Sequence, residues 1–591
     1  MVALIGLGYF ALDGALAGIL ARRGAPLSFV SGFFLMFCAG FLALYLMVLV
    51  GLPLGASFAF ICFVKLAALL WRFYDLISLL REERPPGLIW IVLFLLVTTQ
   101  LVAAKGLLFW DDWGNWGLFA KILWFSDGLP DPARQGTFFD YLLLQSYYWS
   151  AFHFGVLPFE ERLGPAITWL VFAIGMLRFV RHHFAYIFIV LLTTFLFPSE
   201  YFAVTYTDGM LAIAFALLAV EVFEWLEGEG SLLAVIGPLL LLLFAKPAGF
   251  YLAIIAVIAL ILANLIAPLV SGLFSRDDAP AWSWQRMARL CGVILILAAL
   301  KFALVKIFLA TIGAREAQQF SRTLTEAYAA GYLDAFWRAV RNLIFVHDRM
   351  LFVLPVLLLA NLVFLPFSIR ARHVIFFFLA SAGNFVFILV GTLLFFSEQE
   401  ITRAASFTRY MEHTYILAYV LLLGSGAKIH AHLREAFQMS PPGRPALVLS
   451  ALVAYAAVYF FGGFAFYHYR HPLLKATIET ARACAEHDGR FLTVSQNDSG
   501  FFFHVSRLYI YPQELTGEWQ FCPGDTDSEG NRCSATPNRE AWIARLRGWN
   551  VERILLVKDD EYLKQELWPE AIPYPERLPA CVDIRALHNQ P

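Results

Sequence analysis

Long apolar runs, separated by short polar segments, dominate the hydrophobic pattern of the chain. Each run approaches or reaches the roughly 20 residues that a helix needs to cross a bilayer, so we predict a membrane-spanning helix at each. The predicted spans are 1–21, 28–50, 56–79, 88–108, 163–180, 184–198, 208–226, 231–245, 247–268, 290–311, 351–368, 374–397, 410–425 and 445–467. The pattern therefore predicts about 14 transmembrane helices.

Composition agrees with that pattern. Of the 591 residues, 60% are hydrophobic and only 15% are charged, whereas about a quarter of the residues of soluble domains are charged. The chain is therefore expected to be a polytopic α-helical membrane protein surrounded by membrane lipids. Its net charge is −1 and it has no basic tract, so we expect no nucleic-acid partner.

Basic residues give the predicted spans a direction. Every basic cluster follows an odd-numbered span, and loops rich in Lys and Arg stay in the cytoplasm. The remaining loops then face outward, among them 109–162, 312–350, 398–409 and everything after 468. The basic clusters are Arg22 and Arg23; Arg81 and Arg84; Arg178, Arg181, His182 and His183; Arg276, Arg286 and Arg289; Arg370, Arg372 and His373; and Lys428, Arg434 and Arg444.

The composition changes at about residue 469, where charges, Asn, Pro and Gly replace the apolar runs. Two apolar segments there, 490–496 and 552–558, are typical of buried strands. Helical patterns lie at 474–486, 539–547 and 559–568. We predict a small α/β domain outside the membrane.

Four cysteines lie in this last region: Cys484, Cys522, Cys533 and Cys581. An exported domain with four cysteines is expected to form disulfides, and loop length favours the pair Cys522–Cys533. The cysteines form no CxxC pair, which argues against a zinc site.

The most unusual stretch follows the run at 88–108. It reads Phe109-Trp110-Asp111-Asp112-Trp113-Gly114-Asn115-Trp116. Tryptophan is common at a membrane interface, but adjacent acids there are costly to desolvate and tend to mark function. The patterns at 114–127 and 138–153 predict two interfacial helices after it. A structural alternative is that the two aspartates only cap the first of these helices.

Trp110-Asp111, followed by Trp116 and Ala120-Lys121, resembles the first outer loop of glycosyltransferases with the GT-C fold. The resemblance is to family-39-like and dolichyl-phosphate-mannose mannosyltransferase-like enzymes, including the aminoarabinose transferases of lipid A. Four further pieces agree in order: Phe139-Asp140-Tyr141, Tyr206-Thr207-Asp208-Gly209, Lys246-Pro247-Ala248-Gly249 and Arg409-Tyr410. The sequence departs from the family in its three preceding spans and in Pro247, which replaces a polar residue.

The resemblance implies a domain organisation. Residues 1–87 are extra transmembrane helices, and 88–425 form a GT-C-like catalytic core that includes the outer loop 109–162. Residues 426–468 are a cytoplasmic loop and the last transmembrane helix, and 469–591 are the extracytoplasmic α/β domain. The implied location is the inner membrane of a bacterium, with the active site and the last domain on the periplasmic face.

The implied reaction moves a sugar from a polyprenyl-phosphate donor to a cell-envelope glycan, lipid or protein. A carboxylate must deprotonate the acceptor hydroxyl, and cations must hold the departing phosphate. Asp111 occupies the motif position of the base, and Asp112 next to it is the rival. Adjacent acids repel, which raises the pKa of one of them and keeps a proton acceptor poised. The implied phosphate-binding residues are Lys246, Arg409, Arg403 and Lys121. The implied substrate-binding residues are Asp208, Tyr206, Asp140, Tyr141 and His413.

No cofactor is implied. Two carboxylates can hold a divalent metal ion, but no outer loop has a third acid at close spacing, so we predict metal-independent chemistry. Lys301 and Lys306 lie within a predicted span, where lysines need partners that the sequence does not identify. We expect His153 to be a satisfied interfacial histidine.

Two other functions stay open. One is a flippase or transporter of a lipid-linked saccharide, although no inverted repeat of the kind transporters use is visible. The other is an O-antigen-type polymerase or ligase, which the outer loop 312–350 favours through its arginines: Arg315, Arg322, Arg338, Arg341 and Arg349.

Overall fold

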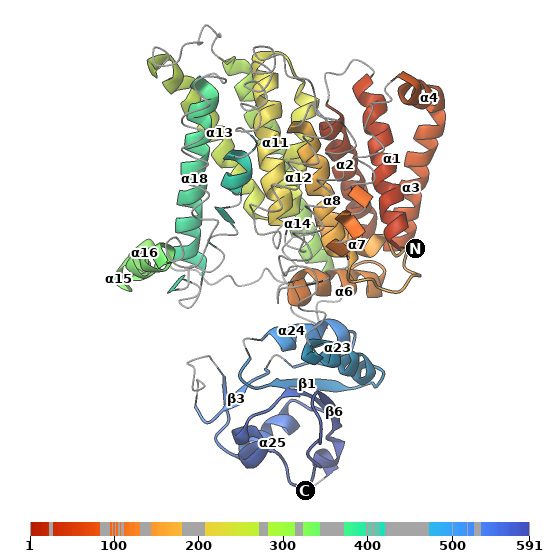
Figure 1. The fold of residues 1–591 in the computed structure, drawn as a ribbon, viewed down its shortest axis with the longest axis vertical. Coiled ribbons are helices and arrows are strands. Elements are labelled where there is room, and N and C mark those ends of the chain that lie inside the picture. The colour runs from red at the N-terminus through yellow and green to blue at the C-terminus, as the bar shows by residue number, and fades with distance from the viewer. Residues whose placement is uncertain are drawn as a thin grey trace, which may run out of the picture.

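The fold is known from a computed structural model and is drawn in Figure 1. It describes residues 2–22, 28–82, 95–96, 98–100, 102–103, 107, 112–130, 144–179, 207–270, 282–313, 323–342, 371–396, 401–402, 407, 410–411, 413–418, 420, 472–498, 500–516, 518–524 and 533–589.

Most of the described chain is helical. Seven of the described helices are long and apolar enough to cross a membrane: α1 (Val2–Arg22), α2 (Phe29–Leu49), α3 (Leu54–Trp71), α11 (Asp208–Glu227), α13 (Ala248–Val270), α14 (Trp284–Ile312) and α18 (Ala371–Phe395). Two shorter apolar helices are α8 (Leu163–Met176), which continues into the 3₁₀ turn η2 (Leu177–Phe179), and α12 (Leu232–Ala245). The chain is therefore a membrane-embedded helical protein.

These nine helices coincide with nine of the predicted spans. The other five, 88–108, 184–198, 351–368, 410–425 and 445–467, lie wholly or partly outside the described residues. The prediction at 56–79 was wrong in one respect, because α3 ends at Trp71 and a separate helix, α4 (Phe73–Glu82), follows it. Arg72 and Asp75 form an ion pair across the break at 3.8 Å, and such charges are unfavourable inside a span.

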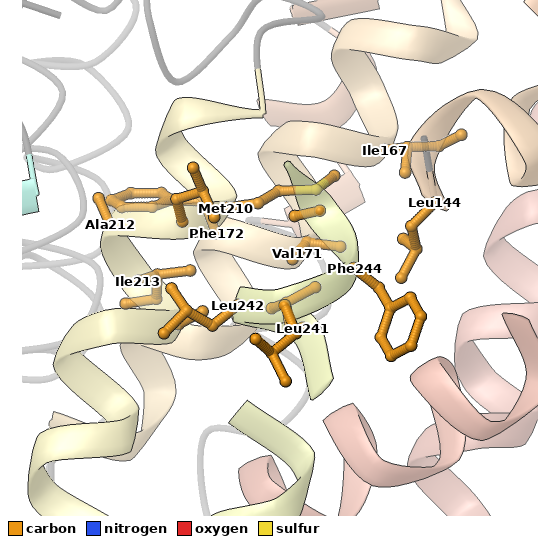
Figure 2. Close-up of a cluster of buried hydrophobic side chains, with 14 of the residues drawn as sticks. Leu144, Ile167, Val171, Phe172, Met210, Ala212, Ile213, Leu241, Leu242 and Phe244 are labelled. Carbon is orange, nitrogen blue, oxygen red and sulfur yellow. The ribbon is translucent and has the colours of Figure 1, made fainter. Parts of the chain in front are cut away.

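The core of the bundle lies around α11. In the apolar stretch of α11, 89% of the residues are buried, against 33% in that of α18. α11 therefore lies inside the bundle, and α18 keeps most of its surface for lipid. Figure 2 shows the packing there: Val171 and Phe172 of α8, Met210 and Ile213 of α11, and Leu242 of α12 gather in one cluster. α13 packs along α18, and α12 packs against α2.

Several short helices lie at the end of the bundle that faces the C-terminal domain (Figure 1). The predicted interfacial helix at 114–127 consists of a π-helical turn, η1 (Asp112–Gly117), and α6 (Leu118–Ser126), which ends at Asp127 with a φ of 44°. The one at 138–153 contains α7 (Leu144–Ala151), and 138–143 lie outside the described residues. α15 (Leu324–Ala329) and α16 (Tyr332–Asn342) follow α14.

The C-terminal domain contains a small sheet with the strand order β2-β1-β5-β6. The two predicted strands are β1 (Arg490–Ser495) and β5 (Arg553–Lys558), which pair in parallel at its centre with Phe491 opposite Arg553. β1 also pairs in parallel with β2 (Glu514–Leu515), and β5 pairs antiparallel with β6 (Ala580–Asp583). β3 (Phe521–Cys522) and β4 (Ser534–Ala535) form a second, two-stranded sheet.

Helices cover this sheet: α23 (Pro472–Ala485), α24 (Phe501–Ile510) and α25 (Arg539–Gly548), with the short turns η5 (Leu563–Leu567) and η6 (Arg585–Asn589). The predicted disulfide Cys522–Cys533 is present, with the Cα atoms 6.0 Å apart. A second disulfide joins Cys484 of α23 to Cys581 of β6, with the Cα atoms 5.8 Å apart. It fixes α23, the helix that leads into the domain, to the edge of the sheet.

Candidate functional site

Lys246, between α12 and α13, is the centre of the candidate site. Its ammonium donates to both carboxylate oxygens of Asp208, at 2.9 and 3.2 Å, and both side chains are buried. It also lies 6.0 Å from the centroid of the Trp116 ring and 5.0 Å from that of Tyr410, within the range of cation–π attraction. Four segments singled out from the sequence thus meet at one ammonium group.

Local backbone chemistry places Lys246. The residue before a proline is driven out of the helical region, and Lys246, which precedes Pro247, is extended with φ −160° and ψ 155°. α12 therefore ends at Ala245, and α13 starts two residues after Lys246. Gly249 allows this tight connection, since a Cβ there would lie 1.6 Å from the carbonyl oxygen of Leu242.

Asp208 is the first residue of α11. The N-terminus of a helix carries a partial positive charge that interacts favourably with a carboxylate, so this position suits an aspartate. The ion pair with Lys246 adds the second stabilising charge. The carboxylate then acts as the group that orients the lysine.

The two aromatic rings come from elements that are themselves anchored. Trp116 belongs to η1, and its backbone carbonyl accepts a hydrogen bond from the Ser146 hydroxyl of α7 at 3.2 Å. The Tyr410 carbonyl accepts from the side-chain amide of Asn384 in α18 at 3.3 Å, and the same amide donates to the Thr414 hydroxyl at 2.9 Å. His413 is buried in this same helical segment.

A second buried lysine reaches the same connection. Lys301 of α14 is 4% exposed, and its ammonium donates to the backbone carbonyl of Lys246 at 3.3 Å. The sequence placed Lys301 inside a span without a partner, and the structure supplies one contact. Its exposed neighbour Lys306, five residues along α14, does not share this burial.

Lys121 lies in a different environment from the one expected for a phosphate-binding residue. Its ammonium donates to the carbonyl of Leu508 in α24 at 2.6 Å, and burial lowers its pKa to about 8. Close by, the Tyr509 hydroxyl donates to Glu161 at 2.8 Å, and Arg482 pairs with Glu161 at 3.4 Å. This contact joins α6 to the C-terminal domain, so we assign Lys121 to domain docking.

The remaining predicted site residues lie outside what the structure describes. Only the backbone of Asp112 is described, as the first residue of η1. Asp111, Asp140, Tyr141, Tyr206, Arg403 and Arg409 are not among the described residues.

His153 is satisfied, as predicted. Its Nδ1 lies 2.8 Å from the Trp149 carbonyl, and its Nε2 accepts from the Glu160 backbone N–H at 2.8 Å. These partners require the neutral ring with the proton on Nδ1, in agreement with a pKa that burial lowers to about 4.

α24 is the element that the sequence reasoning missed. It packs on η1, with the Tyr509 ring 5.8 Å from that of Trp113. A Cβ on Gly114 would lie 2.0 Å from Nδ1 of His504, so the glycine permits the close approach. Apolar residues at 502, 505, 508 and 509 follow helical spacing, a signal that could have identified α24.

The arrangement offers two buried ammonium groups, one carboxylate and two aromatic rings at one helix connection, a set suited to an anion carried on an apolar or sugar-bearing molecule. Among the residues that the structure describes, no three His, Cys, Asp or Glu side chains gather in a metal-binding cluster. No protein-family model, curated protein or solved structure matches the chain.

Proposed function

We propose that the chain is a membrane glycosyltransferase of the GT-C type. It would have about 14 transmembrane helices and transfer a sugar from a polyprenyl-phosphate donor to an acceptor at the periplasmic face of a bacterial inner membrane. The observation that carries the proposal is the convergence on Lys246. Segments near residues 116, 208, 246 and 410 resemble family motifs one by one, and their side chains meet around one buried ammonium group.

In this proposal Lys246 holds the donor phosphate. An ammonium has three N–H donors, and two of them are directed at Asp208, which leaves one for a phosphate oxygen. Arg409 directly precedes Tyr410 and supplies a second cation, with Arg403 close in sequence. Cations at this point stabilise the charge that develops on the departing phosphate.

The base comes from the stretch that begins η1. Asp112 is four residues before Trp116, about one helical turn away, and Asp111 precedes it. One of the two carboxylates takes the proton of the acceptor hydroxyl as its oxygen attacks the anomeric carbon. The new bond joins acceptor oxygen to that carbon, the bond from the carbon to the phosphate oxygen breaks, and polyprenyl phosphate leaves. η1 is π-helical, a geometry that recurs at functional sites.

The substrate side would be formed by Asp208, Tyr206, Asp140, Tyr141 and His413 around the same centre. Asp208 acts there through Lys246, which it orients. The acceptor is a cell-envelope glycan, lipid or protein, and the reaction as written needs no metal ion or other cofactor.

A lipid-linked-saccharide flippase is the second candidate, because one observation favours it. Asp13 of α1 and Lys65 of α3 form a fully buried ion pair about midway along α1, and transporters place charged groups near the bilayer midplane. The two functions differ in product: a flippase moves the lipid without making a new glycosidic bond.

The test uses the purified full chain in liposomes with radiolabelled polyprenyl-phosphate sugar and a cell-envelope lipid extract as acceptor. We expect Asp111→Asn or Asp112→Asn to lower turnover by about 10²–10⁴-fold, the usual contribution of a general base. Lys246→Met should also abolish transfer. Glu229→Gln, an exposed acid beyond the far end of α11, is the control and should leave turnover unchanged.

The outcomes separate the candidates. If both aspartate variants stay folded and turn over like the parent, the base assignment is wrong. If labelled lipid crosses the bilayer and no labelled acceptor forms with any sugar, the protein is a flippase, and Lys65→Met should then stop the movement.

A further inference from the structure

Lys301 carries a charge that the described residues do not neutralise. It is 4% exposed on α14, and within the described part of the chain its ammonium has one hydrogen bond, to the Lys246 carbonyl. Removing an ammonium from water costs several kcal/mol unless a counter-charge and further hydrogen bonds replace the water. Two of its three N–H groups are therefore available for a partner.

The nearby carboxylate does not serve this purpose. Asp208 directs both of its oxygens at Lys246, and in the described residues no ion pair reaches Lys301. Among the described residues, the connection between α12 and α13 thus combines two lysines with one aspartate, which gives it a net positive charge. An anion from outside the chain would balance it.

The one hydrogen bond of Lys301 gives only part of the compensation. Its acceptor is the carbonyl of Lys246, the extended residue that follows α12. That carbonyl also accepts from the Gly249 backbone N–H at 3.1 Å. A shared backbone carbonyl orients the lysine without neutralising it.

We propose that Lys301 binds the phosphate group of the lipid donor, and that Lys246, fixed by Asp208, is the second cation of the same subsite. This rests on the proposed function and deepens it, because it moves the main phosphate contact from the motif lysine to a residue of α14. The ligand class is a phosphate ester on a long isoprenoid chain. The surroundings fit such a molecule: α14 has exposed apolar residues on its lipid-facing side, including Leu300 and Phe302 on either side of Lys301.

The test measures binding rather than catalysis. The full chain in phosphatidylcholine nanodiscs is titrated with a polyprenyl monophosphate, the matching polyprenyl alcohol, and inorganic phosphate, and binding is read by native mass spectrometry. Lys301→Met and Lys301→Gln remove the charge, Lys301→Arg keeps it, and Lys306→Met on the exposed side of the same helix is the matched control. Two neutral variants, Lys301→Met and Lys301→Gln, are used because the test needs only one that folds.

We expect the parent protein to bind the monophosphate at least tenfold more tightly than the alcohol. The neutral variants should lose about tenfold to a hundredfold of the monophosphate affinity, since a hydrogen bond to a charged group contributes about 1.5–3 kcal/mol. Their affinity for the alcohol should not change. Lys301→Arg should retain most of the preference, and Lys306→Met all of it.

Three results would overturn the inference. If the neutral variants lose thermal stability but keep the preference for phosphate, Lys301 only anchors the Lys246 carbonyl, and the proposed function stands with Lys246 as the phosphate ligand. If inorganic phosphate competes at equal concentration, the site binds free phosphate and not a lipid. If the parent protein binds alcohol and monophosphate alike, no phosphate subsite exists.

A further result would support the phosphate subsite but not the proposed glycosyltransferase function. If phosphate preference depends on Lys301 while no sugar is transferred to any acceptor, the subsite assignment holds and the glycosyltransferase assignment fails.

Discussion

At the scale of single residues, Gly249 determines whether Lys246 can reach its partners. α13 starts so close to the end of α12 that a Cβ at position 249 would lie 1.6 Å from the Leu242 carbonyl oxygen and 3.1 Å from a Leu211 methyl group. Real Cβ atoms do not approach backbone this closely, so any side chain here must push the two helices apart. The ion pair with Asp208 depends on the same spacing.

We therefore expect Gly249→Ala to destabilise the protein by more than about 1–3 kcal/mol, the usual cost of overpacking a core, and to abolish phosphate binding. Thermal unfolding in detergent measures the first effect. Gly292→Ala is the control, because nothing lies within 4 Å of a Cβ there and alanine is the better helix former by about 1 kcal/mol. Equal melting temperatures for the two variants would contradict the argument.

The residues of the candidate site were predictable, but their pairing was not. A lysine before a proline and an aspartate at a helix start can be recognised in a sequence, and Lys246 and Asp208 were. Their ion pair joins positions 38 residues apart, which local spacing does not fix. Lys121 shows the limit more plainly, because its partner carbonyl lies 387 residues away in another domain.

At the scale of elements, the first three helices are held together by one buried polar cluster. The Lys65 ammonium of α3 donates to Asp13 of α1, to the Tyr9 hydroxyl at 2.6 Å and to the Met36 carbonyl of α2 at 3.3 Å. The Tyr9 and Tyr148 hydroxyls lie 2.9 Å apart, which connects the cluster to α7. One lysine of α3 thus contacts two other helices, α1 and α2, inside the apolar bundle.

Removing one member of the Asp13–Lys65 ion pair should destabilise the protein far more than removing both. Lys65→Met leaves the Asp13 carboxylate buried without a counter-charge, at a cost of about 3–5 kcal/mol, whereas Asp13→Leu with Lys65→Met should be near neutral. Melting curves followed by size-exclusion chromatography measure the relative stability of the single and double variants. Lys475→Met, which removes an exposed pair with Glu479 at 3.9 Å, should change stability by less than about 1 kcal/mol. A double variant no better than the single one would refute the prediction.

The positions of helices could be predicted from the sequence wherever one physical constraint set their length. Apolar runs of span length identified nine helices because bilayer thickness sets their length. The break between α3 and α4 was missed, since the run continues past Arg72 and only the pair with Asp75 marks the end. α24 was missed because its apolar face packs on η1, a distant partner that no local pattern indicates.

At the scale of the whole molecule, the C-terminal domain is docked on the stretch that carries the two candidate bases. α24 packs on η1 through the Trp113–Tyr509 contact and the Gly114–His504 approach, and Lys121 binds the end of the same helix. Figure 1 shows α23 and α24 on the side of the domain that faces the bundle. The domain is therefore positioned to hold η1, and with it Trp116, against Lys246.

This docking should weaken in acid because of His504. Burial, and next the positive charge of Arg507, lower its pKa from 6.5 to about 4, so the ring is neutral when docked. A group whose pKa falls on docking contributes stability above its free pKa and loses it as the pH falls. The loss should run from about pH 6.5 to pH 4, with a slope of at most about 1.4 kcal/mol per pH unit.

Hydrogen exchange of the η1 and α24 amides between pH 7 and pH 4, corrected for intrinsic rates, measures the effect. We expect protection to fall with pH in the parent protein and to fall less in His504→Gln, which cannot be charged. His487→Gln changes an exposed histidine of the same domain and should follow the parent. Because Glu161, whose pKa is raised by burial, also titrates at this contact, only the difference between parent and His504→Gln reports on His504. Parallel profiles for these two proteins would show that docking does not depend on the charge of His504.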